Sequence, residues 1–270
     1  MKILVIAPSA YHLGGVQNWL DYLLPGMEEN DVEVILGLVD GCWHNASDYL
    51  EKHPWKSTQT ITNPSGSAVG RVRAIAETIE KIQPAIVLSV NIGDTLEAMH
   101  HLKYSDPGAP RLVMSVHGIE GDYIAELEHY QDVVDSVVVT NQLTGKLVRK
   151  LTRVPEERVF YAPYGVALDV PKAPSNLEDT ILWMGRFDQY QKRVLEIPDI
   201  VRLLGETGHC WKLIVAGDGP ESGTLQDAMP SPPSIQVEFT GSISHDRIIR
   251  DILPGCGALL VNSSWETGPI

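Results

Sequence analysis

The chain has little cysteine. It holds three, Cys42, Cys210 and Cys256, far apart in 270 residues and without a C-x-x-C pair. Because the cysteines are few, odd in number and without C-x-x-C spacing, neither a disulfide framework nor a zinc site is indicated. No cluster of His, Cys and Asp stands at metal-ligand spacing and no D-x-D motif occurs, so we expect no metal ion. This cysteine usage fits a reducing, cytoplasmic compartment.

Positive charge is also scarce. The chain has 21 lysines and arginines against 35 aspartates and glutamates, a net charge of −14. Nucleic-acid-binding proteins need basic stripes, so we exclude nucleic acid as a partner. Basic residues gather only between 146 and 158, and they are Lys146, Arg149, Lys150, Arg153 and Arg158. The segment is predicted to be a solvated helix face. The alternative is weak peripheral association with anionic lipid on the inner face of a membrane, or contact with an anionic acceptor.

Long hydrophobic runs are absent. The first apolar run, residues 3–6, is shorter than the apolar region of a signal peptide. No other run approaches the roughly 20 residues of a membrane span. We therefore expect a soluble, cytoplasmic protein with at most that peripheral contact.

What the chain does have is a regular alternation of two patterns. Short, β-branched apolar runs predict strands, and apolar residues at helical spacing predict helices between them. The predicted strands are 2–7, 32–39, 85–90, 111–116, 136–140 and 159–162, then 180–184, 212–216, 235–239 and 258–261. The predicted helices are 16–24, 68–82, 94–102 and 144–151, then 195–204, a short one around Leu225, and 246–253. This alternation predicts an α/β protein with two tandem Rossmann-like, doubly wound parallel-sheet domains.

The domain boundary falls in a stretch rich in Pro, Ala and Asn that has no periodicity. We place an N-terminal domain at 1–168, a linker at 169–179 and a C-terminal domain at 180–270. The second series has only four predicted strands, and the chain stops at Ile270, where a helix opened by Glu266 should continue. We therefore expect the second domain to be incomplete and the chain to be C-terminally truncated.

Two loops at the ends of predicted strands carry residues that suit a phosphate group. Gly14-Gly15 precedes the helix at 16–24, where free backbone amides let an anion approach. Gly185-Arg186-Phe187 follows the strand at 180–184, with Lys192 in the same loop. Arginine gives two-point contacts to phosphate and lysine gives a mobile charge. On spacing alone, a plain turn and a solvated loop explain the same residues.

His117 follows the predicted strand at 111–116. Open α/β sheets bind ligands outside the carboxyl ends of their strands, which favours a site residue, although a lone histidine is more often structural. A competing signal lies at 217–223, where the glycine spacing is similar to a dinucleotide loop and Glu238 ends the next strand. It leaves a dinucleotide oxidoreductase as an alternative.

Taken in chain order, these pieces resemble retaining glycosyltransferases of the two-domain GT-B fold, glycosyltransferase family 4. The matching pieces span the chain: 2–8 with Gly14-Gly15, Ser115-Val116-His117-Gly118, Ala162-Pro163-Tyr164-Gly165-Val166 with Asp169, Gly185-Arg186-Phe187 with Lys192, Gly217-Asp218-Gly219-Pro220, Phe239-Thr240-Gly241-Ser242-Ile243 and Ser263-Ser264-Trp265-Glu266. The last piece resembles the opening of the family's E-x7-E motif, whose second glutamate would lie beyond Ile270. Two residues depart from the family pattern: Arg193 stands where glycine is frequent, and Tyr164 where asparagine is frequent.

The resemblance implies transfer of a sugar from a UDP-, GDP- or ADP-linked donor to an acceptor hydroxyl on a glycan, lipid-linked or small molecule. It implies retention of configuration, no cofactor or metal ion, and a place in cell-envelope polysaccharide biosynthesis. The catalytic roles it implies fall on His117, which positions the sugar, Arg186 and Lys192, which stabilise the leaving diphosphate, and Glu266, which accepts sugar hydroxyls. It places Gly14, Gly15, Ile243, Thr267 and Gly268 at the donor, and Tyr11, Gln17 and Asn18 at the acceptor.

Two further alternatives stand beside the oxidoreductase. One is a related GT-B nucleotide-sugar epimerase, and the other is a non-catalytic or inactive nucleotide-sugar-binding fragment. Because the second glutamate of the motif would lie beyond Ile270, we expect the fragment itself to bind donor weakly and to turn over little.

Overall fold

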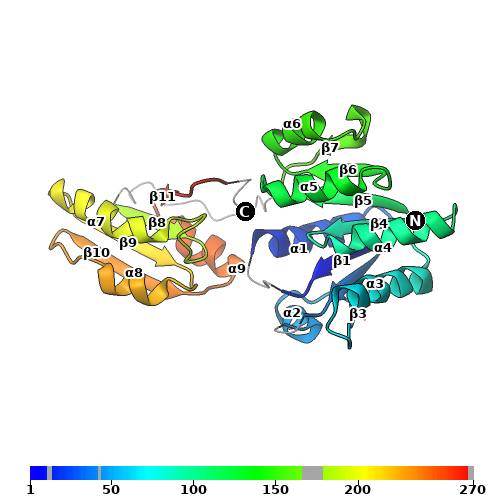
Figure 1. Ribbon diagram of the computed structural model, residues 1–270. Helices are drawn as coiled ribbons and strands as arrows, with labels where there is room; N and C mark the ends of the chain where they lie inside the picture. Colours follow the sequence, from blue (N-terminus) through cyan, green and yellow to red (C-terminus); the bar gives the residue numbers. More distant parts are fainter. Residues whose placement is uncertain (11–13, 42–43, 166–178, 267–270) are drawn as a thin grey trace. The chain divides into compact units, whose positions relative to one another are not determined.

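The computed structural model describes residues 1–10, 14–41, 44–165 and 179–266. The chain divides into two compact units, residues 1–166 and 167–266. Each unit is built around a sheet of its own (Figure 1). Five residues with a place in the family resemblance lie outside the described residues, and they are Tyr11, Val166, Asp169, Thr267 and Gly268.

The first unit contains a seven-stranded sheet in the order β3-β2-β1-β4-β5-β6-β7. The strands are β1 (Lys2–Pro8), β2 (Glu33–Val39), β3 (Thr58–Ile61), β4 (Ile86–Val90), β5 (Arg111–Val116), β6 (Ser136–Val139) and β7 (Val159–Tyr161). All neighbouring strands are parallel. A parallel sheet is covered on both faces, and accordingly β1 is buried without interruption from Ile3 to Ala7.

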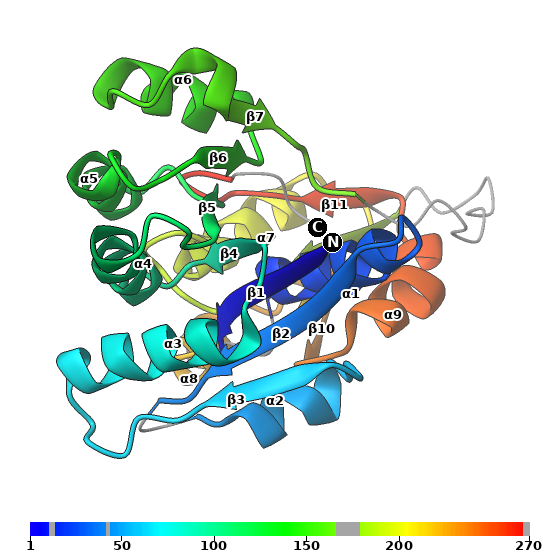
Figure 2. The ribbon, with the colours of Figure 1, turned by 90° about the vertical axis from the view of Figure 1, so that its right-hand side faces the viewer.

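Helices cover both faces of this sheet. They are α1 (Gly15–Glu28), α2 (Ala46–Lys52), α3 (Ala68–Ile82), α4 (Asp94–Ser105), α5 (Gly121–Tyr130) and α6 (Gln142–Leu151), with a 3-10 turn η1 at Glu156–Arg158. Figure 2 shows α3, α4, α5 and α6 ranged along one side of the strands. Their apolar faces, such as Ile75 and Ile79 of α3, build one core cluster. Trp19 and Leu20 of α1 and Tyr49 of α2 belong to a second cluster.

The second unit contains a four-stranded parallel sheet in the order β10-β9-β8-β11. Its strands are β8 (Thr180–Met184), β9 (Trp211–Ala216), β10 (Ile235–Gly241) and β11 (Ala258–Leu260). Its helices are η2 (Val194–Glu196), α7 (Ile197–Glu206), α8 (Ser222–Ala228) and α9 (His245–Arg247), followed by a π-helical turn η3 (Ile248–Ile252) and a 3-10 turn η4 (Leu253–Gly255). Trp183 and Phe187 are fully buried in its main core.

The α/β class with two parallel sheets is confirmed. Three elements were not predicted from the sequence, namely α2, β3 and α5, so the first sheet has seven strands where six were expected. β3 lies at the sheet edge and only Ile61 of its four residues is buried, so it carries little apolar signal. The predicted helix at 246–253 is instead a succession of short α, π and 3-10 turns.

Two loops of the second unit meet at glycine residues. Gly217, which follows β9, has a φ of 143°, and a Cβ added there would lie 1.9 Å from the carbonyl oxygen of Gly185. A Cβ on Gly219 would lie 2.6 Å from the carbonyl oxygen of Phe187. The Phe187 amide donates a hydrogen bond to the Asp218 carbonyl at 2.9 Å. The glycines that suggested a dinucleotide loop therefore allow a close backbone contact between the loops after β8 and β9.

We expect Gly217→Ala to lower the free energy of unfolding by about 2 kcal/mol or more, because the new methyl group meets backbone and φ is unfavourable for alanine. Urea unfolding measures the change. Gly223→Ala is the matched control, because nothing lies within 4 Å of a Cβ at that position of α8. It should leave stability unchanged or raise it by up to about 1 kcal/mol. Equal stability of the two variants would contradict the crowding at Gly217.

Candidate functional site

His117 lies at the carboxyl edge of the first sheet, directly after β5. The strand order reverses direction between β1 and β4, because β2 and β3 lie on one side of β1 and β4 to β7 on the other. Ligands of open α/β sheets bind beside such a switch point, outside the carboxyl ends of the strands. The loops after β1, β4 and β5 therefore form the candidate site of the first unit.

Both ring nitrogens of His117 are hydrogen-bonded inside the protein. The Ser115 hydroxyl donates to the Ser89 carbonyl at 2.9 Å, so its oxygen accepts from His117 Nε2 at 3.0 Å. The proton is therefore on Nε2, and Nδ1 accepts a hydrogen bond from the Tyr164 hydroxyl at 2.8 Å. This network fixes one tautomer and one orientation of the ring.

His117 is also enclosed by aromatic rings. Its side chain is 4% exposed. The Trp19 ring meets it edge-on at 4.5 Å between centroids, and the Tyr164 ring lies nearly parallel to it at 5.7 Å. Burial lowers the pKa of His117 to about 3, because a water-poor environment disfavours the charged imidazolium. At neutral pH His117 is a neutral, fixed polar group.

The N-terminus of α1 has no side-chain cap. Gly14 is the N-cap residue, its backbone is extended, and no acidic residue lies in the first turn. Among the described residues, no side chain therefore caps the first amides of the helix. Among the predicted acceptor residues on this helix, Gln17 is buried and Asn18 is half-buried.

A small cavity of about 10 Å³ lies at the ends of β4 and β5. Among its lining residues is Asn91, which follows β4, has a φ of 53°, and carries a buried side-chain oxygen without a partner among the described residues. Glu126 also lines it, and its pKa is raised by burial and by the charges of Asp94 and Asp122. The volume approaches that of a single water molecule. Sequence reasoning missed these residues, and the only signal was an asparagine just after a strand, where left-handed backbone is tolerated.

In the second unit, the structure brings Lys192 and Glu266 together. Lys192 Nζ donates to Glu266 Oε1 at 2.5 Å, and the two side chains are 20% and 22% exposed. Lys192 belongs to the loop after β8, and Glu266 follows β11, which pairs with β8. Parallel neighbours place their following loops at one edge of the sheet, so residues 74 positions apart meet there.

Arg186, in the same loop as Lys192, is also paired. Its Nε donates to Asp188 Oδ2 at 3.0 Å. Burial raises the pKa of Asp188, but hydrogen bonds from the Gln191 amide and Arg186, with the charge of Arg186, outweigh that effect and hold the pKa below its usual value. Each cation of this loop thus has a carboxylate partner. Asp188 was not identified from the sequence.

Three hydrogen bonds fix the segment before Glu266. The Ser264 amide donates to the Gln191 carbonyl at 2.8 Å. Asn262 accepts from the Trp183 indole at 2.8 Å and donates to the Arg193 carbonyl at 2.9 Å. The loop that carries Lys192 and the segment that carries Glu266 are therefore held together by backbone and side chains. These hydrogen bonds could not be predicted from the sequence, because the residues that they join are far apart in the chain.

Two other residues named from the sequence have clear structural places. Arg193 has a left-handed backbone, with a φ of 50°. This conformation explains why glycine suits the position after the lysine. Ile243 follows β10 and is half-buried against the apolar cluster that contains Leu182 and Ile214.

Of the predicted site residues, Lys192 and Glu266 are in contact and Arg186 shares their loop, whereas His117, Gly14 and Gly15 belong to the first unit. Within the described parts of the chain, no group of three or more His, Cys, Asp or Glu side chains is arranged to hold a metal ion.

No protein-family profile matches the chain, and no curated protein matches it either. Solved structures do. The lipopolysaccharide outer core galactosyltransferase WaaB in its apo form has a TM-score of 0.67 at 14% identity, over 100% of this chain and 76% of that one. TarM of S. aureus, in a complex with UDP, has a TM-score of 0.73 at 8% identity, over 98% and 82%. A UDP-GlcNAc 2-epimerase from Neisseria meningitidis, bound to UDP-GlcNAc, has a TM-score of 0.59 at 11% identity, over 94% and 74%. At these identities the likeness shows the fold alone, which is GT-B-like.

We expect the His117 ring signals in nitrogen-15 NMR to remain those of neutral imidazole from pH 8 to pH 5. The pKa of about 3 in the folded chain lies below the value of about 6.5 in an unfolded chain. As pH falls, the histidine of the unfolded chain takes up a proton before the buried His117 does. The contribution of neutral His117 to the free energy of unfolding is therefore complete above pH ~6.5 and declines as the pH falls toward ~3. His117→Gln should flatten that decline. A titration midpoint near neutrality would contradict the buried network.

We expect Arg193→Gly to be more stable than Arg193→Ala by about 1 kcal/mol, because both lose the ion pair with Glu196 and only glycine relieves the left-handed backbone. Thermal and urea unfolding of the two variants give the difference. A more stable alanine variant would show that Arg193 is not left-handed in solution.

Proposed function

We propose that the chain transfers a sugar from a nucleotide-sugar to an acceptor hydroxyl with retention of configuration. The observation that carries the proposal is the contact of Lys192 with Glu266, beside Arg186, beyond the carboxyl ends of β8 and β11. Two cations suit a diphosphate, and a carboxylate suits sugar hydroxyls. A nucleotide-sugar carries both groups. The fold shared with WaaB and TarM supports the same reading.

In the free protein, the two cations of this site are held in ion pairs with carboxylates, and donor binding would exchange these contacts for contacts with the diphosphate. Lys192 is 2.5 Å from Glu266, and Arg186 is 3.0 Å from Asp188. We infer that the donor diphosphate takes over contacts from the two carboxylates. Glu266 is then released to accept hydrogen bonds from the sugar. As negative charge builds up on the leaving phosphate, the fixed cations stabilise it.

The reaction needs no nucleophile from the protein. The acceptor oxygen forms the new bond to the anomeric carbon on the face from which the diphosphate departs. The bond between that carbon and the phosphate oxygen breaks, its electron pair stays on the phosphate, and the acceptor proton passes to a phosphate oxygen. The products are the glycosylated acceptor and a nucleoside diphosphate. The family resemblance also places Gly14 and Gly15 at the donor, and this stays a prediction; the amides that begin α1 after them are of the kind that binds an anion.

The remaining roles follow from the family resemblance and stay predictions. His117 positions the transferred sugar as a neutral group, with Tyr164 and Ser115 fixing its ring. Ile243 lies near the base, and the amides of Thr267 and Gly268 contact the donor. Tyr11, Gln17 and Asn18 contact the acceptor. The donor is UDP-, GDP- or ADP-linked, no metal ion or cofactor takes part, and the product belongs to a cell-envelope polysaccharide.

A cytoplasmic location with weak membrane contact is part of the proposal. Among the described residues, none of the helices has the length and apolar character of a membrane span. Lys146 and Lys150 on α6 are exposed and could contact anionic lipid. Arg149 and Arg153 are already paired with Glu156 and Asp132. The basic segment is thus less cationic than its sequence indicates, and its membrane contact should be weak.

The second candidate is epimerisation of the sugar of a nucleotide-sugar. Its support is the likeness to the Neisseria meningitidis UDP-GlcNAc 2-epimerase, whose chain is matched over 74% of its length. An epimerase needs acid and base groups beside the sugar ring. Among the described residues, Glu126 has a raised pKa, but the cavity that it lines at the ends of β4 and β5 has a volume of about 10 Å³, too small for a sugar ring. This candidate predicts a changed sugar without any acceptor.

We expect Arg186→Ala and Lys192→Ala each to lower kcat/KM by about 10²–10³, because each removes a cation that stabilises the leaving diphosphate. Release of nucleoside diphosphate from UDP-, GDP- and ADP-sugars measures the rate. The matched control is Arg202→Ala, since Arg202 is exposed on α7 and pairs with Asp199 in the same unit. Normal turnover in both test variants would reject the assigned roles.

The products of this assay separate the alternatives. Proton NMR of the glycosylated acceptor should show the donor's anomeric configuration, and inversion would reject the retaining mechanism. An epimerised sugar formed without acceptor would favour the second candidate. Binding of nucleotide-sugar without any turnover would identify a binding protein, and tight NAD binding an oxidoreductase.

A further inference from the structure

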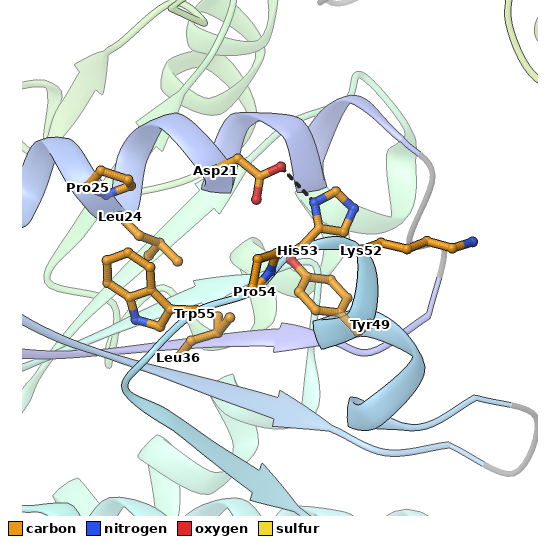
Figure 3. A pocket seen from close by; sticks show the side chains of 9 residues that line it. All are labelled: Asp21, Leu24, Pro25, Leu36, Tyr49, Lys52, His53, Pro54 and Trp55. Atoms are coloured by element: carbon orange, nitrogen blue, oxygen red, sulfur yellow. Dashed lines mark hydrogen bonds and ion pairs between the residues drawn. The ribbon is translucent and has the colours of Figure 1, made fainter. Parts of the chain in front are cut away.

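A second pocket lies in the first unit, between α1, α2 and the loop after α2. Its volume is about 260 Å³. Figure 3 shows its two sides. Leu24, Leu36 and Trp55 gather on one side, and Asp21, His53 and Tyr49 gather on the other. The pocket thus has an apolar wall facing a polar wall.

This pocket is remote from the candidate site at the carboxyl edge of the same sheet. α1 begins at the carboxyl end of β1 and runs to Glu28, close in sequence to the start of β2 at Glu33. Asp21 and Leu24 lie in the later part of that helix. His53 and Trp55 lie after α2, on the way to the start of β3 at Thr58. The lining residues therefore lie toward the amino ends of the strands, so a ligand here is not at the reaction site.

Tyr49 and Trp55 give the pocket two hydrogen-bonding groups. The Tyr49 side chain is 1% exposed, and its hydroxyl makes no hydrogen bond with any of the described residues. Burial, and then the nearby charge of Asp21, raise the pKa of Tyr49, so the hydroxyl keeps its proton. The indole nitrogen of Trp55, which also lines the pocket, is a buried donor without a partner among the described residues, and a native protein rarely keeps such a group without a ligand or a water molecule. Tyr49 therefore offers a hydrogen-bond donor and acceptor to whatever enters.

Asp21 and His53 complete the polar wall. Asp21 belongs to α1, and its Oδ2 lies 2.7 Å from His53 Nδ1, a contact that fixes the carboxylate within the polar wall. Among the described residues, the other carboxylate oxygen of Asp21 makes no hydrogen bond or ion pair. A fixed carboxylate accepts hydrogen bonds from hydroxyl groups strongly. The same negative charge disfavours a phosphate or carboxylate ligand, and the Lys52 side chain, which also lines the pocket, points away from it (Figure 3).

We propose that this pocket binds one neutral saccharide ring. A pyranose has one apolar face of C–H groups and a rim of hydroxyls, which matches the wall of Leu24, Leu36 and Trp55 facing Tyr49 and Asp21. The volume lies just below the roughly 300–1,000 Å³ of sites for drug-sized ligands, which suits a single ring. The ring packs on the aromatic and aliphatic wall, donates a hydroxyl to Asp21 and exchanges a hydrogen bond with Tyr49. This site does not depend on the transfer reaction.

Saturation-transfer NMR tests the proposal with the full chain. The probes are the methyl glycosides of glucose, galactose, mannose and N-acetylglucosamine. We expect at least one glycoside to bind. Tyr49→Phe and Asp21→Asn should each weaken that binding by about tenfold or more, because each removes a hydrogen-bonding group from the pocket. Tyr104→Phe should not change it, because Tyr104 is 91% exposed on α4.

Two controls keep the result interpretable. Tyr49→Phe removes only an unpartnered hydroxyl, so its melting temperature should stay the same or rise, and loss of binding cannot come from unfolding. Arg186→Ala should leave glycoside binding intact, which separates this pocket from the donor site. Absence of binding by all four glycosides would overturn the proposal. Equal binding in the Tyr49→Phe and Asp21→Asn variants would overturn it as well.

Discussion

Every strand pairing in the two sheets is parallel, and the rest of the molecule depends on that constraint. A parallel sheet must be covered on both faces, which requires a helix or crossover after nearly every strand. It also collects all the loops that follow strands at one edge. His117 after β5, Gly15 after β1, and Lys192 after β8 occupy such loops because of this geometry, not because they are near one another in the chain.

The same constraint explains which parts of the fold could be predicted. β1 and β5 are buried on both faces, so their apolar runs are continuous and their bounds follow from the sequence. The fifteen residues of α3 repeat their apolar positions over four turns. β3, by contrast, is an edge strand of four residues with one buried side chain, and it forms because β2 supplies its partner. α2 has seven residues, too few for a periodic signal. Whether such short elements form depends on their contacts with the rest of the fold and not on their own sequence pattern.

At the candidate sites, the sequence was enough to identify several site residues, but not the residues with which they form hydrogen bonds and ion pairs. Arg186, Lys192 and Glu266 follow from the resemblance, but the contact between Lys192 and Glu266 depends on β11 lying beside β8, a long-range pairing that no local spacing encodes. His117 likewise was identifiable at a strand end. Its tautomer depends on Ser89, Ser115 and Tyr164, which come from three parts of the chain. The pocket around Tyr49 has no sequence motif at all, because it exists only where α1 packs beside α2.

The hydrogen-bonded set of Ser89, Ser115, His117 and Tyr164 also has a consequence for how the sequence can diverge. Ser115, His117 and Tyr164 are joined through their side chains in a buried environment, so replacing one leaves its neighbour unpaired at a cost that a second replacement can recover, whereas Ser89 takes part through its backbone carbonyl, which any residue supplies. The three side-chain positions are therefore energetically coupled and should vary as a group. Tyr164, where the family resemblance leads us to expect asparagine, is then one of several ways to satisfy Nδ1 of His117, and a substitution at either position should depend on the residue at the other.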